Sequence, residues 1–386
     1  MLNNNKVIPE RVREARISRD LTTTQLAESL EITRQCISQY ELGHSEPTHS
    51  ILRKMVEVLE FPVAFFYKPL PQTNNLESIS FYSPTFFRSL KAARKSGKNK
   101  VTIRTDWLEE IYLYLNQYVD FPVVNVPDMS KYLTGKELSQ DEIEDIAEYV
   151  RKNWGLGIGP ISNILLLLEK NGFVIARNSI KDKKIDAFSQ WKGETPYIYL
   201  SSDKDCAVRT RFDASHELGH LLLHIDSDQH NYDDEKYIKT IEQEANKFAS
   251  AFLLPRDSFG QEVMSTSLDH FINLKRRWKV SIQAMIYRCS DLGILNENQI
   301  LYLRKQISIR KMRTNEPLDD ELIPESPVML KQAVEIILEE NSLNNEKIVD
   351  ELCLPIEEIE ALTNLPKGTL SLSGHVIPLK LKNHRS

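Results

Sequence analysis

The sequence predicts a mainly α-helical protein with a small antiparallel β-sheet. Apolar residues recur at helical spacing over most of the 386-residue chain. Three short runs rich in β-branched and aromatic residues, 173–177, 187–191 and 197–200, are typical of strands and follow one another closely. A chain of this length predicts two or three domains. We therefore expect an α+β protein in which helical segments precede and follow a single sheet.

The composition is that of an ordinary soluble protein. The net charge of -6 gives no overall signature of nucleic-acid binding, so a contact with DNA would need a local basic face. The four cysteines are scattered without a Cys-x-x-Cys pair, which fits reduced thiols and a cytoplasmic location. The start of the chain has no apolar signal region and no apolar run reaches 18 residues, so we expect no membrane partner.

Residues 7–68 are predicted to form an all-helical domain. Its four helices begin at a capping residue or a proline, namely Pro9, then Thr22 or Thr23, then Thr33, then Pro47. The third helix covers 34–42 and ends at Gly43. Two residues separate the second helix from the cap of the third, which is the length that a helix-turn-helix requires.

The third helix would then be a recognition helix, whose first residues contact base edges in such folds. Arginine suits guanine and glutamine suits adenine through paired hydrogen bonds. The candidate DNA contacts are Arg34, Gln35, Ser38 and Gln39, with Thr33 near a phosphate. The alternative is a helical protein-interaction domain, because residues 1–66 carry eight Lys or Arg against nine Asp or Glu.

This segment resembles the Xre/Cro-type repressor domain over nearly its full length. The matching framework residues are Leu21-Thr22, Leu26-Ala27, Ile37-Ser38, Tyr40-Glu41-Leu42-Gly43 and Pro47. The resemblance implies binding to operator DNA, and such domains often pair to read two half-sites, so a homodimer is a possible state. Thr23 stands where that family usually has a phosphate-binding Gln, and its hydroxyl would bind a phosphate more weakly.

Residues 69–135 are expected to form a linker that contains a basic stretch and a helix over 106–116. The basic residues of the stretch are Arg88, Lys91, Arg94, Lys95, Lys98, Lys100 and Arg104, with no acidic residue among them. A charge run of this kind is more often a solvated helix face. The alternative is an arm that contacts DNA phosphates beside the N-terminal domain.

A His-Glu-x-x-His motif at residues 216–220 is the strongest chemical signal. Two imidazoles four residues apart lie on one face of a helix, which suits a tetrahedral zinc ion. We therefore predict His216 and His220 as ligands of one zinc per chain. Zinc makes water acidic enough to lose a proton near neutral pH, and Glu217 could take that proton during hydrolysis of a peptide bond. Histidines that are merely exposed are the alternative, but an apolar leucine run after the motif predicts a buried helix.

Catalytic zinc sites usually have three protein ligands, and Glu244 is the predicted third. In the helical segment 241–255 its carboxylate shares the apolar face, where it would need a partner. Glu242 lies about 200° around that helix from Glu244 and is expected to point away. Three ligands in a row on one helix would span ~12 Å, too far for one ion. The rival is His224, one turn beyond His220 on the motif helix, which is instead expected to support a ligand or to be structural. Asp226 and His230, in the polar loop that follows, are weaker rivals still.

These residues resemble the ImmA/IrrE family of zinc metallopeptidases from about residue 145 to 257. The matching stretches are 211–224, 244–249 and 253–255, with 185–189 and 196–200 upstream. The resemblance implies a zincin-like metallopeptidase domain, which we place at 136–257, with His216, His220 and Glu244 as zinc ligands and Glu217 as the general base. Members of that family are site-specific endopeptidases that cleave a DNA-bound repressor.

Residues 258–386 are predicted to form a helical C-terminal region, with helices near 268–278, 280–288, 330–339, 345–352 and 355–362. The first two resemble the continuation of long family members. The last three could be a sensor, a dimerisation element or a second helical module, and the sequence leaves these open.

The sequence as a whole predicts a DNA-binding transcriptional regulator with a zinc endopeptidase domain. Its partners would be operator DNA and a protein substrate, a repressor or the chain itself, cleaved on a signal. Fusion would raise the concentration of the peptidase near a substrate bound to DNA. The alternative is a non-cleaving transcription factor or an antitoxin-like regulator, whose zincin domain serves as a sensor or scaffold.

Overall fold

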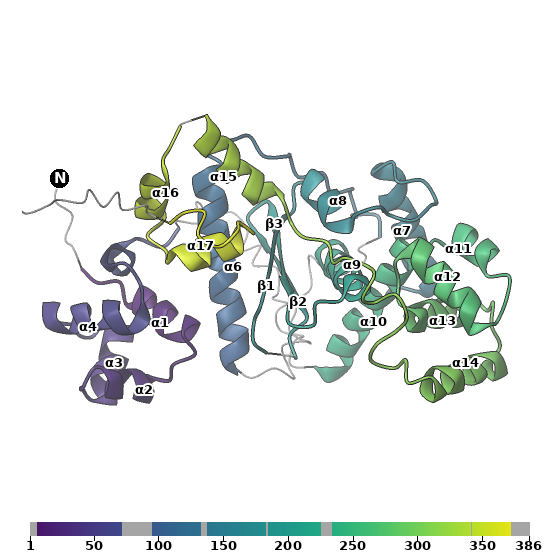
Figure 1. The fold of residues 1–386 in the computed structure, drawn as a ribbon, viewed down its shortest axis with the longest axis horizontal. Coiled ribbons are helices and arrows are strands. Elements are labelled where there is room, and N and C mark those ends of the chain that lie inside the picture. Colours follow the sequence, from purple (N-terminus) through teal and green to yellow (C-terminus); the bar gives the residue numbers. More distant parts are fainter. Residues whose placement is uncertain are drawn as a thin grey trace, which may run out of the picture.

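The computed structural model describes residues 6–71, 95–132, 137–182, 184–224, 234–340 and 342–371. In these residues the fold is mainly helical around one three-stranded sheet, which confirms the predicted α+β class. Figure 1 shows an elongated molecule with the N-terminal helices at one end and the sheet near the middle. In the described part of the chain, no helix combines the length and the apolar character needed to cross a membrane.

The sheet is mixed, and its order is β1-β3-β2. Strand β2 (Ala187–Lys192) and strand β3 (Thr195–Ser201) form a hairpin, in which Gly193 takes the positive φ that its tight turn requires. Strand β1 (Val174–Asn178) pairs with β3 in parallel, on the side away from β2. The prediction of a wholly antiparallel sheet was wrong for the pairing of β1. Strands β1 and β2 are not neighbours, because β3 lies between them and runs parallel to β1.

Both faces of the sheet are buried, and each contributes to a different apolar core. Val174, Tyr197 and Tyr199 belong to the first core, which also contains the N-terminal helices. Ile175 and Ile198 belong to the second core, which contains the motif helix. Since successive side chains of a strand point to opposite faces, the sheet is the wall between the two cores.

The N-terminal helices are α1 (Pro9–Ser18), α2 (Thr23–Ser29), α3 (Arg34–Glu41), α4 (His49–Leu59) and the 3₁₀ helix η1 (Val63–Tyr67). Hydroxyls of Thr22, Thr33 and Thr48 accept a backbone N–H in the first turns of α2, α3 and α4. The cap of α2 is therefore Thr22. Helix α2 ends at Ser29, so three residues rather than the predicted two separate it from Thr33, the cap of α3.

Helix α6 (Lys95–Leu115) begins 11 residues before the predicted start at Asp106. Two residues of the predicted basic stretch lie inside the protein: Lys100 Nζ is 2.6 Å from Asp20, and Arg104 is 2.9 Å from Glu358. For these two residues the solvated face and the DNA-contacting arm are both wrong, because partners far away in the sequence neutralise them. Arg88, Lys91 and Arg94 lie outside the described residues.

The second core is enclosed by helices on the other side of the sheet. These are α7 (Gln140–Asn153), α8 (Ile164–Lys170), α9 (Ala207–Leu223), α10 (Glu235–Leu253), α11 (Arg256–Glu262), α12 (Leu268–Trp278), α13 (Ile282–Asp291) and α14 (Glu297–Ile309). Helix α9 packs on β2 and β3, and α10 packs between α9 and α7. Helices α11 to α14 extend the molecule away from the sheet (Figure 1).

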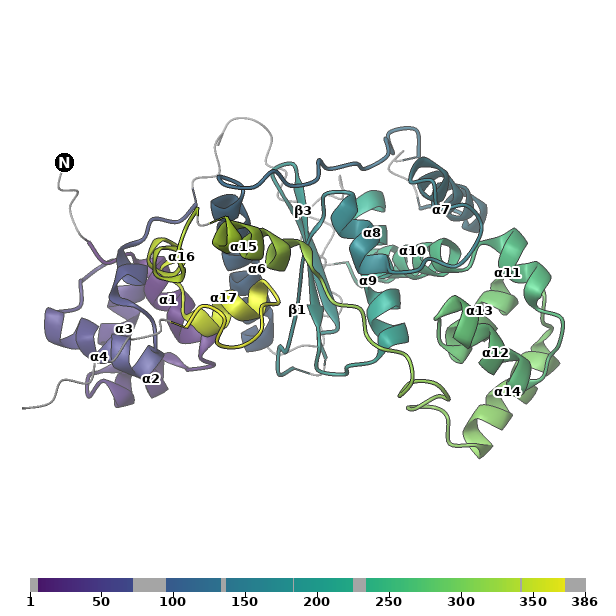
Figure 2. The same ribbon diagram turned by 45° about the horizontal axis from the view of Figure 1, so that its top comes forward.

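The C-terminal helices are α15 (Met329–Glu339), α16 (Asn345–Leu352) and α17 (Ile356–Leu362). They do not continue the group formed by α11 to α14. Figures 1 and 2 show that the chain returns across the molecule, so that α15 to α17 lie beside α6 and the N-terminal helices. The predicted C-terminal region is thus divided between the two cores.

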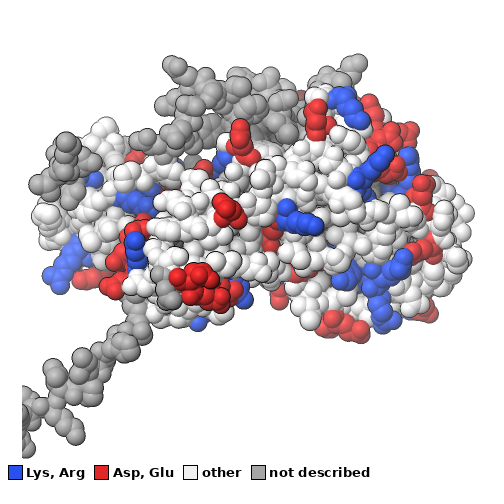
Figure 3. Space-filling view, turned by 90° about the horizontal axis from the view of Figure 1, so that it is seen from above, with Lys and Arg blue, Asp and Glu red and all other residues white. Residues whose placement is uncertain are grey.

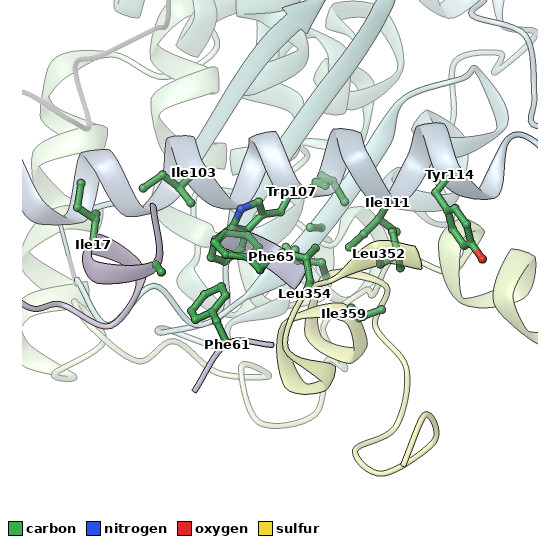
Figure 4. Packing of buried hydrophobic residues seen from close by; sticks show 14 of the residues in the cluster. Ile17, Phe61, Phe65, Ile103, Trp107, Ile111, Tyr114, Leu352, Leu354 and Ile359 are labelled. Carbon is green, nitrogen blue, oxygen red and sulfur yellow. The ribbon is translucent and has the colours of Figure 1, made fainter. Parts of the chain in front are cut away.

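Helix α6 joins the N-terminal helices to the sheet and to the C-terminal helices. The indole ring of Trp107 lies 5.7 Å from the ring of Phe61 and 6.1 Å from that of Phe65. Figure 4 shows Leu352 and Ile359 packed along the same helix. Fixed in this way on both sides, α6 is part of one continuous core with the N-terminal domain.

Buried charges strengthen the same junction. The guanidinium of Arg11 on α1 is fully buried and lies 2.8 Å from Glu14 and 2.7 Å from Glu110 of α6. Lys68 Nζ lies 3.0 Å from Glu110 and also donates to the carbonyl of Leu352. Each charge has an opposite partner, so removing one would leave another uncompensated in the core.

Candidate metal centre

The candidate centre forms where α9 and α10 approach each other closely. A Cβ atom at Gly219 would lie only 3.1 Å from Phe248 and 3.2 Å from Ala245. Glycine on α9 and alanine on α10 therefore allow the two helices to meet. The turn of α9 on either side of Gly219 carries His216 and His220 toward α10.

The two histidines of the motif present the same ring nitrogen to each other. Their Nε2 atoms are 3.0 Å apart. The opposite nitrogen of each ring has its own partner: Nδ1 of His216 lies 3.1 Å from Oδ1 of Asn246, and Nδ1 of His220 lies 3.0 Å from Nδ1 of His224. A proton on Nδ1 of His216 can bond to the carbonyl of Asn246, which leaves the Nε2 lone pair of that ring directed at the centre.

The carboxylate beside these two nitrogens belongs to Glu242, not to Glu244. Its oxygens lie 3.6 Å from Nε2 of His216 and 3.7 Å from Nε2 of His220. The expectation that Glu242 points away was wrong. The face of α10 that meets α9 carries Glu242, Ala245 and Asn246, whose small or polar side chains permit the close contact.

Glu244 lies behind the centre, where it holds another histidine. Its Oε2 is 2.9 Å from Nε2 of His224, and its Oε1 accepts the backbone N–H of Leu138 at 2.8 Å. Glu244 shares its side of α10 with Phe252, whose ring lies 6.0 Å from Trp154, the cap that follows α7. Phe252 of this face thus lies at the end of α7, whereas Phe248 packs against Gly219 of the motif helix. Asp226 and His230 lie outside the described residues.

The donor set fits a divalent metal ion such as zinc. Donor atoms of His216, His220 and Glu242 all lie within 4.8 Å of one another. Ligands around a tetrahedral ion at ~2.1 Å lie about 3.4 Å apart, close to the separations of 3.0, 3.6 and 3.7 Å in the structure. Two imidazoles and one carboxylate also form the ligand type of many catalytic zinc sites.

Burial favours the neutral form of His220 and His224. The pKa of His220 lies well below its ordinary value because the ring is buried and has two other histidines as neighbours. Burial likewise lowers the pKa of His224, although Glu244 opposes that shift. A neutral imidazole has a lone pair to offer without first losing a proton.

Glu217 lies beside the centre and is held by the sheet. The hydroxyl of Ser189 on β2 donates to Oε2 of Glu217 at 2.5 Å. Burial raises the pKa of Glu217 to about 8, which makes its carboxylate a stronger base. Sequence reasoning missed Ser189. The available signal was a hydroxyl on the same face of a predicted strand as the apolar residues Ala187 and Trp191.

The predicted DNA contacts lie on the N-terminal helices, away from the metal centre. Arg34, Gln35 and Ser38 on α3 are exposed, and Gln39 is half-buried. In both ribbon views α1 lies between α3 and α6, so α3 is not covered by α6 (Figures 1 and 2). The first residues of α3, the predicted recognition helix, are therefore open to solvent.

The two predicted phosphate contacts also belong to this surface. Thr33 is exposed, and its hydroxyl accepts the N–H of Cys36 as the cap of α3. Thr23 is half-buried and forms the first residue of α2.

On the face drawn in Figure 3, Lys and Arg are interspersed with Asp and Glu, which agrees with the net charge of -6. The charge pattern of that face therefore does not mark a nucleic-acid surface.

Two family models match the chain. Residues 12–66 match a helix-turn-helix model, and residues 168–290 match the IrrE N-terminal-like domain of a peptidase family. The second match begins in α8, includes the sheet and the metal centre, and ends in α13. The search of the curated proteins gave no match.

Proposed function

We propose that this protein is a DNA-binding regulator that is also a zinc endopeptidase. It carries a helix-turn-helix domain followed by an IrrE/ImmA-like domain. Its substrate would be a repressor-type protein, and its centre would hold one zinc per chain. One observation carries the proposal: His216, His220 and Glu242 converge, and the buried carboxylate of Glu217 is close enough to Glu242 for that charge to raise its pKa. This arrangement puts a base next to a ligand set of the catalytic type.

Each residue of the centre has a distinct role in this proposal. Zinc, when bound, supplies a Lewis acid that polarises the scissile carbonyl and acidifies water. His216, His220 and Glu242 would hold the ion. Glu217 would remove a proton from the attacking water and pass it to the leaving amine, and Ser189 would orient the Glu217 carboxylate.

The substrate would bind along β2. Among the described strands β2 pairs only with β3, so it lies at an edge of the sheet, and it also carries Ser189. An extended peptide can add to such an edge through backbone hydrogen bonds. Proline at alternate positions of a substrate peptide would remove donors from this pairing and reduce cleavage. Cleavage that tolerates proline at every position would contradict this mode of binding.

The N-terminal domain would place the centre at an operator. Arg34, Gln35, Ser38 and Gln39 would contact bases, with Thr23 and Thr33 near phosphates. Pairing of two chains on a palindromic site is the expected arrangement for such a domain. Selection from random duplex DNA tests this part: the protein should enrich one sequence, and Gln35→Ala should relax it at one position by about 1–3 kcal/mol.

The cleavage proposal is tested with Glu217→Gln, which keeps the size of the side chain and removes the base. We expect this variant to retain zinc and to lose cleavage. Cells that express either form are compared for new protein N-termini. Termini that appear with the wild type and not with Glu217→Gln identify the substrate, whereas termini produced equally by both forms would contradict the mechanism.

A non-cleaving regulator is the second candidate, because the N-terminal domain shares a core with the sheet. Tyr197 and Tyr199 of β3 belong to the same apolar cluster as Phe61 and Phe65 of the N-terminal domain. A change at the metal centre could therefore alter operator binding without proteolysis. Zinc-dependent DNA affinity, with no new termini in the wild type, would favour this candidate.

A further inference from the structure

A buried chain of hydrogen bonds leads from the backbone to the candidate metal centre. The N–H of Leu138 donates to Oε1 of Glu244, Oε2 of Glu244 is 2.9 Å from Nε2 of His224, and Nδ1 of His224 is 3.0 Å from Nδ1 of His220. Glu244, His224 and His220 are at most 6 % exposed. The chain ends at the His220 ring, whose Nε2 faces the centre.

The direction of donation along these hydrogen bonds follows from which groups carry a proton. A carboxylate only accepts, so Glu244 accepts one bond from the backbone and one from an Nε2–H of His224. Nδ1 of His224 is then an acceptor, and Nδ1 of His220 must carry the proton between them. In a neutral imidazole this leaves the lone pair on Nε2 of His220, where a metal ligand needs it.

We propose that Glu244 and His224 are positioning residues that fix the tautomer of His220 for metal binding. The inference rests on the proposed zinc centre and deepens it, because it gives a role to a carboxylate that lies outside the ligand set. At His216 the Nδ1 proton can bond to Oδ1 of Asn246, at 3.1 Å. Partners of this kind typically change metal affinity by about 10–100-fold.

Glu244→Gln reverses the direction without removing an atom contact. The amide oxygen of glutamine can still accept the N–H of Leu138, and its NH₂ then donates to Nε2 of His224. His224 now carries its proton on Nδ1 and donates it to Nδ1 of His220. The proton of His220 is displaced to Nε2, which opposes metal binding.

The test combines the tautomer of His220 with zinc affinity. Nitrogen-15 NMR of the imidazoles in metal-free protein should show an Nδ1–H tautomer for His220 in the wild type and an Nε2–H tautomer in Glu244→Gln. Chelator competition should show zinc binding about 10–100-fold weaker in Glu244→Gln. The control is Glu235→Gln, which removes the same charge from an exposed position of the same helix and should leave both readings unchanged.

A second variant separates the effect of Glu244 through His224 from any other effect of Glu244. His224→Phe keeps a ring of similar size and interrupts the chain, so Glu244→Gln should cause no further loss of zinc affinity in that background. An equal loss in both backgrounds would overturn the proposal, because Glu244 would then act directly on the ion. An unchanged tautomer in Glu244→Gln would also overturn it. Absence of zinc binding in the wild type would instead overturn the metal centre itself.

Discussion

The pKa of Glu217 is the result of opposing effects. Burial of the carboxylate raises its pKa, the hydrogen bond from Ser189 lowers it, and the acidic neighbours Glu242 and Asp213 raise it further. Burial is the largest of these effects, so the pKa reaches about 8. The same burial that makes Glu217 a good base also makes its ionised form costly to the metal-free fold.

The first prediction concerns the pH dependence of metal-free stability. In the unfolded chain Glu217 ionises near pH 4.5, whereas in the folded chain it ionises near pH 8, so the folded state binds the proton more tightly. The stability that this proton provides is complete below pH 4.5 and is lost as the pH rises through 8. Glu217→Gln stays neutral and escapes this loss. Its unfolding free energy relative to the wild type should therefore increase by roughly 2–4 kcal/mol from pH 5 to pH 8.5.

Urea unfolding of both proteins in the presence of a chelator measures this difference. Ser189→Ala is a useful companion, because loss of its hydrogen bond should raise the pKa of Glu217 further and extend the loss of stability to higher pH. A difference between Glu217→Gln and wild type that stays constant over this pH range would contradict the assigned pKa.

At the scale of elements, two carboxylates connect helix α8 with the C-terminal segment. One carboxylate comes from each side. Glu325 accepts the N–H groups of Ile164 and Leu165 at the start of α8 and pairs with Arg211 of α9. Glu169, near the end of α8, accepts the N–H of Met329 at the start of α15. Acidic groups at helix N-termini satisfy unpaired N–H groups and interact favourably with the helix dipole.

The second prediction is that Glu169→Ala loosens α15. Removal of the carboxylate leaves the N–H groups of Val328 and Met329 without their acceptor, and we expect a loss of about 1–2 kcal/mol. Hydrogen exchange should become faster at the start of α15 and remain slow in α9. Glu335→Ala, on a half-exposed position of the same helix, serves as the control. Equal acceleration in both variants would argue against a capping role.

Packing between elements also explains what the sequence could and could not predict. His216 and His220 lie on one helix, so their spacing alone brought them together correctly. The third carboxylate comes from another helix, and the sequence does not state which face of α10 meets α9. At the close approach of the two helices, Gly219 meets Ala245 and Phe248, so Glu242 lies beside the motif histidines and Glu244 reaches His224 instead. The pairing of β1 depended in the same way on contacts distant in sequence.

At the scale of the whole molecule, two cores share one sheet as their common wall. The N-terminal helices, α6 and α15 to α17 belong to the first core, and the candidate metal centre belongs to the second. Charge composition could not reveal this arrangement. The sequence predicts Lys100 and Arg104 at the surface, whereas in the structure they pair with Asp20 and Glu358. The DNA-binding domain is therefore part of the main body of the protein rather than a tethered module.

The third prediction is that the first core unfolds as a unit. Trp107→Ala removes a fully buried ring between the N-terminal and C-terminal helices and should cost about 3–5 kcal/mol. Hydrogen exchange should accelerate together in α1, α6 and α17, with a smaller change in α12 and α13. Trp278→Ala, in the second core, should show the opposite distribution. Acceleration confined to α6 in Trp107→Ala would contradict a shared core.

The most direct test of the account is the zinc content of purified protein, wild type beside Glu242→Ala and His220→Ala. We predict about one zinc per chain in the wild type and loss of that zinc in both variants, since each removes one of three protein ligands. Zinc that remains bound in Glu242→Ala, or a wild type that binds no zinc after reconstitution, would contradict the proposed centre.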